Sequence, residues 1–319
     1  MTNGSMVALA MQGFDHPPTV VDVPVPEPGA AEVRVRVTAA SVNAYDVFVA
    51  AGSMKDYLPH EFPVVLGQDI AGVVDALGEG VTGWRVGDRV FGTLGMKPRM
   101  HDGTFAEFST PQVGALVRMP QGLGEEEAGS LGVAGTTAAS AVDAVTPAEG
   151  SILLVAGATG GVGTFAIQLA AARGAHVVAS VRPGDEGFVT DLGAAETADY
   201  SGDLAAAIRE RHPDGLDAVI DLVNRDPDDF AALTTLVRDG GRAASAVGGA
   251  GEATAIGGVT VSNVGSDPAH LAALADQVVT GTLRVAIRRT YPLAEAATAL
   301  SDFVGEHTLG KLVISMPVR

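Results

Sequence analysis

The chain has 319 residues, of which 47% are hydrophobic and 18% charged, so two domains or one large domain are expected, and disorder on the scale of a domain is not. A formal net charge of −18 argues against nucleic acid or an anionic membrane as a partner. The chain has no cysteine, which excludes disulfides and thiolate zinc sites.

The N-terminal region carries no signal for export. Residues 1–10 lack a basic region followed by a long apolar run, and every apolar stretch of the chain ends well short of ~18 residues. We therefore expect a cytoplasmic protein without a membrane-spanning helix. Thr2 to Ser5 resemble a flexible leader ahead of Met6, and the sequence leaves open whether residues 1–5 are native.

The first third of the chain is predicted to be rich in short strands. Apolar and charged residues alternate from Val33 to Val37, which is the period of a strand with one wet face. Further strands are expected at 70–77, at 87–91 after a Gly-Asp turn, and at 105–109. Short strands separated by turn residues indicate a barrel-like β domain.

From Ser151 onward the chain alternates strands and helices. Continuous apolar runs separated by helical segments indicate a parallel, doubly wound sheet. The expected strands are 152–156, 177–181, 218–223, 243–247 and 259–264, and the expected helices are 162–173, 203–212 and 230–238. The tail adds a helix at 269–279, a short strand, a helix at 293–304 and a strand at 311–315.

A glycine-rich turn follows the first of these strands and opens the next helix. Glycines let backbone N–H groups approach a pyrophosphate, and the positive end of the helix faces the phosphates. Ala158 replaces the first glycine of the usual fingerprint, while Gly160 and Gly163 hold the other two positions. The turn therefore predicts dinucleotide binding by Ala158, Thr159, Gly160, Gly161, Val162 and Gly163.

The end of the second strand predicts which dinucleotide binds. NAD-binding folds carry a carboxylate there that bonds the ribose hydroxyls. Here Arg182 stands nineteen residues after Gly163, with Ser180 two residues before it. A guanidinium grips a 2′-phosphate through two hydrogen bonds, so NADPH is expected rather than NADH.

Five segments together resemble the medium-chain dehydrogenase/reductase family. They are residues 66–74 (LGQDIAGVV), 77–81 (LGEGV), 86–90 (VGDRV), 161–163 (GVG) and 310–313 (GKLV). The similarity covers essentially the whole chain. It implies an α/β protein with a GroES-like β-barrel catalytic domain, residues 1–126 completed by 267–319, and a Rossmann NADPH-binding domain with a doubly wound parallel sheet, residues 127–266.

The resemblance is to the zinc-free branch of that family. Zinc members carry a Cys and a His where this chain has Asn43 and Gln68, and neither side chain replaces a thiolate or an imidazole as a zinc ligand. No metal site is therefore expected. The metal-free branch, similar to quinone oxidoreductases, zeta-crystallin and plant alkenal reductases, transfers hydride to quinones or conjugated enones.

The same resemblance suggests further contact residues. Asn43 and Asp46 match an Asn-x-x-Asp segment, which implies that Asn43 lies near the nicotinamide ribose or the substrate, while Asp46 is expected to tie the loop to the backbone. The remaining positions that match cofactor contacts of the family are Thr137, Tyr200, Leu222, Val223, Val247 and Gly248.

Two tyrosines are candidates for a proton donor beside the candidate catalytic Asn43. Reduction of an enone requires a proton on carbon, which Tyr57 or Tyr45 could supply, although ordinary packing explains each tyrosine at least as well. Many quinone reductases have tyrosines where this chain has Phe48 and Met54. A quinone takes its proton from water, so an obligatory catalytic side chain is not required.

The sequence therefore predicts an NADPH-dependent oxidoreductase that acts on a small quinone or enone. One alternative is a C=C reductase of enones or enoyl thioesters in a biosynthetic pathway, and another is a non-catalytic NADPH-binding protein. A homodimer is also expected, because residues 259–264 form an apolar strand at the predicted edge of the Rossmann sheet, which pairing with a second copy would cover.

Overall fold

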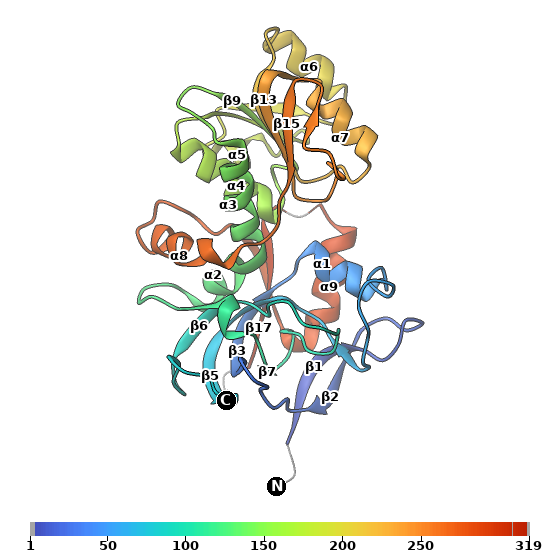
Figure 1. The fold of residues 1–319 in the computed structure, drawn as a ribbon, viewed down its shortest axis with the longest axis vertical. Helices are drawn as coiled ribbons and strands as arrows, with labels where there is room; N and C mark the ends of the chain where they lie inside the picture. Colours follow the sequence, from blue (N-terminus) through green and yellow to red (C-terminus); the bar gives the residue numbers. More distant parts are fainter. Residues whose placement is uncertain (1–3, 308, 318–319) are drawn as a thin grey trace. The chain divides into compact units, whose positions relative to one another are not determined.

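The computed structural model describes residues 4–307 and 309–317, and the chain folds as two compact units. The first unit comprises Met1–Val133, Leu271–Thr282 and Ile287–Arg319, and the second comprises Ala134–His270 and Leu283–Ala286. Figure 1 shows the β-rich first unit and the sheet of the second unit with its helices. No helix in the described part of the chain is long and apolar enough to cross a membrane.

The first unit contains two sheets, with strand orders β2-β1-β4 and β16-β17-β3-β5-β6-β8, and β7 pairs with β3. The strands are β1 (Ser5–Met11), β2 (Thr19–Pro24), β3 (Val33–Ser41), β4 (Val64–Val65), β5 (Asp69–Leu77), β6 (Arg89–Thr93), β7 (Phe108–Ser109), β8 (Leu116–Arg118), β16 (Ile287–Pro292) and β17 (Lys311–Ser315). The helices are α1 (Ala44–Ala50), α2 (Glu125–Ser130), α8 (Leu271–Val279) and α9 (Ala296–Gly305).

Strand β3 is central to the larger sheet. Its alternating sequence predicts one buried face, and Val33, Val35 and Val37 are indeed buried while the residues between them are partly exposed. β3 pairs antiparallel with β5 on one side and with β17 on the other. The C-terminal strand therefore completes the sheet that the first third of the chain begins (Figure 1).

The second unit is built on one sheet with strand order β11-β10-β9-β12-β13-β15-β14. All pairs are parallel except β14 with β15, which confirms the expected doubly wound sheet. The strands are β9 (Ile152–Ala156), β10 (His176–Val181), β11 (Glu196–Asp199), β12 (Leu216–Asp221), β13 (Val237–Ser245), β14 (Ala255–Ile256) and β15 (Val259–Asn263). The helices are α3 (Thr136–Val145), α4 (Gly161–Ala172), α5 (Glu186–Thr190), α6 (Leu204–Arg211) and α7 (Pro227–Thr234).

Several sequence-based boundaries are wrong. The helix expected at 230–238 is α7, which begins earlier because Asp226 caps it and Pro227 occupies its first turn, and residues from Val237 onward belong to β13. The strand expected at 105–109 shortens to β7. The predicted domain boundary after residue 126 falls inside α2, which packs against β3 and β5 of the first unit.

Part of the expected leader is ordered. Ser5 is the first residue of β1 and pairs with Pro24, and the carbonyl of Gly4 accepts a hydrogen bond from the amide of Val25 at 3.0 Å. Thr2 and Asn3 lie outside the described residues. β1 was not predicted from the sequence because a continuous run of apolar residues hides its alternation.

Strand β15 is not the free edge that the sequence predicts. β14 pairs with it through Ala255 and Ile256, and the amide of Val261 donates to the carbonyl of Thr254 at 3.0 Å. The side chain of Asn263 bonds the backbone of the same returning segment. The chain thus covers this edge of β15 itself. The homodimer stays a prediction, but β15 is not free to form its interface.

Candidate active site

Most of the predicted cofactor residues lie at one edge of the Rossmann sheet. The glycine-rich turn follows β9, Arg182 follows β10, Tyr200 follows β11, and residues 222–223 and 247–248 follow β12 and β13. Because these strands are parallel, their carboxyl ends meet at the same edge, where open α/β sheets bind their ligands. The fold therefore gathers side chains that are far apart in the sequence.

Two glycines of the turn stand where a side chain would be crowded or strained. Gly157 adopts φ +84°, and a Cβ there would lie 2.9 Å from Cγ2 of Val223 and 3.1 Å from Cβ of Leu222. A Cβ on Gly163 would lie 2.6 Å from the carbonyl oxygen of Ala158, so the helix can approach the turn only without a side chain. Gly157 was not among the predicted residues, although its place directly after the strand marks it.

The turn leads into α4 with its amide groups positioned for an anion. Gly160 is extended at the helix N-cap, and the first turn of any α-helix leaves backbone N–H groups without intrahelical partners. The twelve residues of α4 add a positive end at the same place. These features fit the pyrophosphate of a dinucleotide.

Three buried polar side chains hold the loops of this edge. Ser180 accepts a hydrogen bond from the amide of Gly157 at 3.1 Å. Asp221 accepts from the amides of Val223 and Asn224, at 3.1 and 3.2 Å, and Ser245 accepts from the amide of Gly249 at 2.9 Å. Burial raises the pKa of Asp221, and its Oδ2 has no hydrogen-bond partner among the described residues. Each strand end thus fixes the loop beside it.

Ser180 has a structural role that the sequence did not predict. It is only 2% exposed, and its hydroxyl accepts the amide of Gly157 and so supports the glycine-rich turn, while its predicted contact with a 2′-phosphate stays a prediction. Arg182 is exposed, and its guanidinium carbon lies 5.7 Å from the ring centroid of Tyr200. This cation–π contact brings together the two side chains expected at the adenosine end.

Thr137 is placed differently from the strand-end residues. It lies in the first turn of α3, is 6% exposed, and this helix packs against α4, β12 and β13. Val223 after β12 is 56% exposed, and Gly248 after β13 is exposed too.

The first unit contains a buried polar cluster around Asp69. Asp69 Oδ2 accepts hydrogen bonds from Ser41 Oγ at 2.5 Å and from Asn43 Nδ2 at 2.9 Å, while its Oδ1 accepts from the amide of Val133 at 2.6 Å. The ammonium of Lys311 lies 3.7 Å from Oδ2 and donates to Asn43 Oδ1 at 2.7 Å. All four side chains are at most 6% exposed. The cluster therefore pairs one buried cation with one buried carboxylate.

The predicted catalytic residue Asn43 is engaged on every side. Both of its amide hydrogens are donated, to the carbonyl of Ser41 at 3.1 Å and to Asp69, and its oxygen accepts from Lys311. One lone pair of Oδ1 remains for any further contact. The geometry supports a group that is rigidly positioned, and the predicted contact with the nicotinamide ribose stays a prediction.

Asp46 ties the loop to the backbone as expected. Its Oδ2 accepts from the amide of Asn43 at 2.8 Å, which closes one half of a capping box at the start of α1. Its Oδ1 is buried with no hydrogen-bond partner among the described residues. Burial raises the pKa of Asp46 to about 8, and burial also lowers the pKa of Lys311.

The two candidate tyrosines lie in different surroundings. Tyr57 is 77% exposed. The hydroxyl of Tyr45 contacts Sδ of Met100 at 3.9 Å, and burial followed by the charge of Asp46 raises its pKa. Tyr45 therefore holds its proton more firmly than a free tyrosine, which does not favour it as an acid.

Asn43 and Gln68, which stand where zinc members of the family carry their ligands, do not fit zinc. The oxygen of Asn43 faces the ammonium of Lys311, and a second cation at that oxygen would be repelled. Gln68 offers only a neutral amide. In the described residues no group of three or more His, Cys, Asp or Glu side chains is arranged to hold a metal ion.

Asp69 and Lys311 are the residues that sequence reasoning missed. Both stand inside the family-like segments 66–74 and 310–313, where they served only as signature positions. A charged residue within an apolar strand sequence was the available signal, because such a side chain is buried only with a partner.

Comparisons with known proteins agree with this architecture. Residues 29–142 match the alcohol dehydrogenase GroES-like domain, and residues 192–314 match the zinc-binding dehydrogenase family. The chain is 31% identical to the chloroplast envelope quinone oxidoreductase homolog of Arabidopsis thaliana, over 95% of this chain and 94% of that protein.

Two further similarities cover nearly the whole chain. The structure of the quinone oxidoreductase from Coxiella burnetii matches with a TM-score of 0.86 and 29% identity, over 99% of this chain and 100% of that one. A segment of the mycocerosic acid synthase-like polyketide synthase of Mycobacterium tuberculosis is 33% identical, and it covers 99% of this chain and 15% of that protein. The expected fold, a GroES-like domain with a Rossmann domain, is confirmed.

The turn geometry predicts different effects for two Gly→Ala substitutions. Gly163→Ala forces a Cβ against backbone oxygen and is expected to lower the unfolding free energy of the cofactor-free protein by about 1–3 kcal/mol. A Cβ on Gly160 meets only the carbonyl of Gly157 at 3.5 Å, so Gly160→Ala should cost less than about 1 kcal/mol. Gly160→Ala should nevertheless weaken NADPH binding, because the pyrophosphate approaches this backbone. Urea denaturation measures the unfolding free energies and cofactor titration measures the affinities. Equal destabilisation by the two variants would contradict the crowding at Gly163.

The buried carboxyl group predicts a pH-dependent stability. Because the pKa of Asp46 rises from 3.8 to about 8 on folding, the folded chain retains a proton that the unfolded chain releases. The contribution of this proton to the unfolding free energy is fully present at pH values below about 4 and is lost as the pH rises through 8. Asp46→Asn mimics the protonated form, so its unfolding free energy should exceed that of the wild type increasingly between these pH values. Asp56→Asn, at an exposed aspartate, is the control, and parallel pH profiles for all three proteins would refute the assignment.

Proposed function

The chain belongs to the medium-chain dehydrogenase/reductase family, in its quinone oxidoreductase-like branch of NAD(P)H oxidoreductases. From this membership we propose that the protein transfers hydride from NADPH to a quinone or conjugated enone without a metal. The observation that carries the cofactor part is the placement of Arg182. The observation that carries the metal-free part is the ammonium of Lys311 at the oxygen of Asn43.

The strand end after β10 supports NADPH over NADH. Arg182 is exposed there beside Tyr200, where its guanidinium is available to a 2′-phosphate. A carboxylate lies on the neighbouring strand, since Asp199 pairs with Val181. However, Oδ1 of Asp199 accepts hydrogen bonds from the amide and the hydroxyl of Ser201, at 2.8 and 2.7 Å. One oxygen of Asp199 is thus engaged locally, and we assign the 2′ position to the arginine.

The choice of acceptor follows from the missing Lewis acid. Zinc polarises an alcohol or carbonyl oxygen in metal-dependent dehydrogenases. Quinones and conjugated enones delocalise the negative charge that hydride brings, so they need less polarisation. NADPH supplies the hydride when bound, and the chain's own residues bind and orient the reactants.

The second candidate is reduction of a C=C bond in an enone or enoyl thioester of a biosynthetic pathway. It is favoured by the 33% identity with a segment of a polyketide synthase. It also requires a proton donor for carbon, for which Tyr57 and Tyr45 remain the candidates. The two functions share conjugated enones but differ in quinones and enoyl thioesters, so rates with these last two acceptors separate them.

A panel of acceptors tests the function. Purified protein with NADPH should reduce a benzoquinone or a conjugated enone, and its rate should be unchanged after exhaustive chelation. Turnover of an enoyl thioester but not of a quinone would select the second candidate. Stoichiometric zinc that is lost together with activity would refute the metal-free proposal, and tight NADPH binding without any turnover would indicate a non-catalytic protein.

Arg182→Ala tests the cofactor preference. Loss of a charge-assisted bond to the 2′-phosphate should weaken NADPH binding by about 10- to 150-fold and leave NADH binding nearly unchanged. Arg209→Ala is the matched control, because this exposed arginine of α6 bonds only Thr235 Oγ1, at 2.9 Å, among its recorded side-chain partners. Fluorescence titration with both cofactors measures the effect, and equal losses for NADPH and NADH would contradict the assignment.

A further inference from the structure

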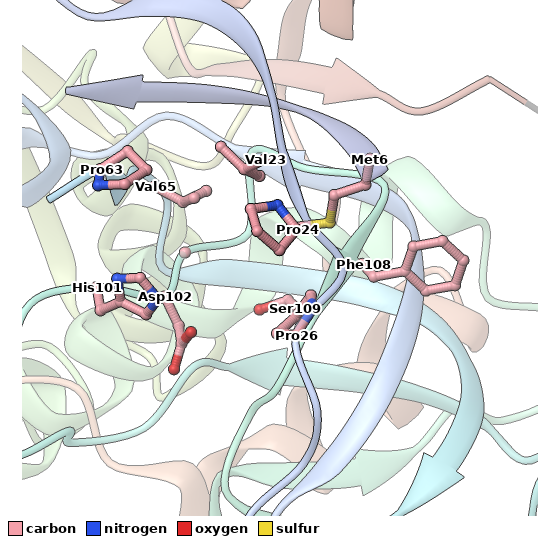
Figure 2. Close-up of a pocket in the computed structure, with 11 residues that line it drawn as sticks. Met6, Val23, Pro24, Pro26, Pro63, Val65, His101, Asp102, Phe108 and Ser109 are labelled. Carbon is pink, nitrogen blue, oxygen red and sulfur yellow. The ribbon is translucent and has the colours of Figure 1, made fainter. Parts of the chain in front are cut away.

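The first unit contains a pocket of about 180 Å³ that the proposed reaction does not use. Its walls come from β1, β2, β4 and β7 and from the loop at 101–103 (Figure 2). The apolar lining is dominated by three prolines and three aliphatic side chains, Pro24, Pro26, Pro63, Met6, Val23 and Val65. Most of these side chains are short or rigid, so the space cannot close by side-chain rotation alone.

A buried hydroxyl in this pocket lacks a partner. Ser109 is 1% exposed, and its Oγ forms no hydrogen bond with any of the residues that the structure describes. Its backbone is fixed in β7, where it pairs with Val35 of β3. Figure 2 shows the Ser109 side chain among the residues that surround the pocket. A buried hydroxyl without a hydrogen bond costs folding free energy, so a ligand that bonds it has a defined advantage.

The other polar groups of the pocket are acceptors. Nδ1 of His101 lies 2.9 Å from the carbonyl oxygen of Glu61, which can only accept, so the ring proton of a neutral His101 is on Nδ1 and Nε2 is an acceptor. Asp102 contributes a carboxylate. A ligand that satisfies this wall therefore brings a hydrogen-bond donor, whereas Ser109 can both donate and accept.

The polar wall is held in place from behind. The buried ammonium of Lys97 lies 3.3 Å from Oδ2 of Asp102 and donates to the carbonyl of Thr110, the neighbour of Ser109, at 2.6 Å. Gly103 lies so close to the backbone of β4 that no Cβ fits between them. The two polar sides of the pocket are thus fixed to each other through one lysine.

We propose that this pocket binds a monocyclic phenol. A cavity of about 150 Å³ in another protein holds one benzene ring, so a space of about 180 Å³ suits a single ring with a small substituent. The phenolic hydroxyl donates to the acceptor wall at His101 or Asp102 and accepts from Ser109, while the ring packs against the prolines and Phe108. The proposal is independent of the catalytic function.

Titration calorimetry on the whole protein tests the site, with phenol as the probe. The expected dissociation constant is about 0.1–1 mM, a value within reach of so small a ligand. Ser109→Ala should weaken phenol binding by about five- to tenfold, the effect of one hydrogen bond. Ser53→Ala, at an exposed serine of the same unit, should bind phenol as the wild type does. Toluene, which has the ring without the hydroxyl, should bind at least about fivefold more weakly than phenol.

The variant is suited to the test because it removes only an unpaired hydroxyl. Ser109→Ala should not lower the melting temperature of the ligand-free protein, since no recorded side-chain hydrogen bond is lost. Crystals soaked in phenol should show its hydroxyl between Ser109 and the wall formed by His101 and Asp102, with the ring against the prolines. The proposal is overturned if Ser109→Ala binds phenol as tightly as the wild type does, or if toluene binds as tightly as phenol. It is also overturned if no binding is seen at a phenol concentration 10 times the expected constant of about 1 mM, or if the phenol density lies at another place.

Discussion

The ammonium of Lys311 lies 2.7 Å from Oδ1 of Asn43 and 3.7 Å from Oδ2 of Asp69, in a region where all three side chains are almost completely buried. These residues stand at the start of β17, at the cap of α1 and at the start of β5. A buried charge without its partner costs several kcal/mol, so each of these elements is held by the others. The arrangement of the first unit depends on this one ion pair and its hydrogen bonds.

The same cluster decides what the unit can do chemically. It directs a positive charge at the oxygen that stands where zinc members of the family have a ligand, and it uses both amide hydrogens of Asn43 internally. A cation that is part of the chain thus lies 2.7 Å from the side-chain oxygen of the residue at that position. This supports a reaction whose acceptor delocalises charge by itself. The Rossmann unit follows a similar rule, since Ser180, Asp221 and Ser245 each fix a loop at the edge that suits a cofactor.

Local patterns predicted much of both units. The strand at 152–156, the following glycine-rich turn and the strand at 311–315 were placed correctly, because apolar periodicity and turn glycines are local properties. Arg182 and Tyr200 were assigned to one end of the cofactor, and the structure brings them within 5.7 Å of each other. The hydrogen bond between Ser180 and the amide of Gly157 was not predicted, because the sequence does not reveal which partner a hydroxyl finds. β14 was missed because its two residues leave no periodic pattern.

By itself, the sequence determined most of the strand and helix order from Ser151 onward, the family resemblance and the dinucleotide turn, since each depends on residues close together in the chain. Only the tertiary structure decided the partners of buried polar groups. Lys311 and Asn43 are 268 residues apart, and Ser109 Oγ has no hydrogen-bond partner among the described residues because five separate segments form the walls around it. Whether a polar atom is satisfied depends on which distant segments surround it after folding, and no local pattern encodes that.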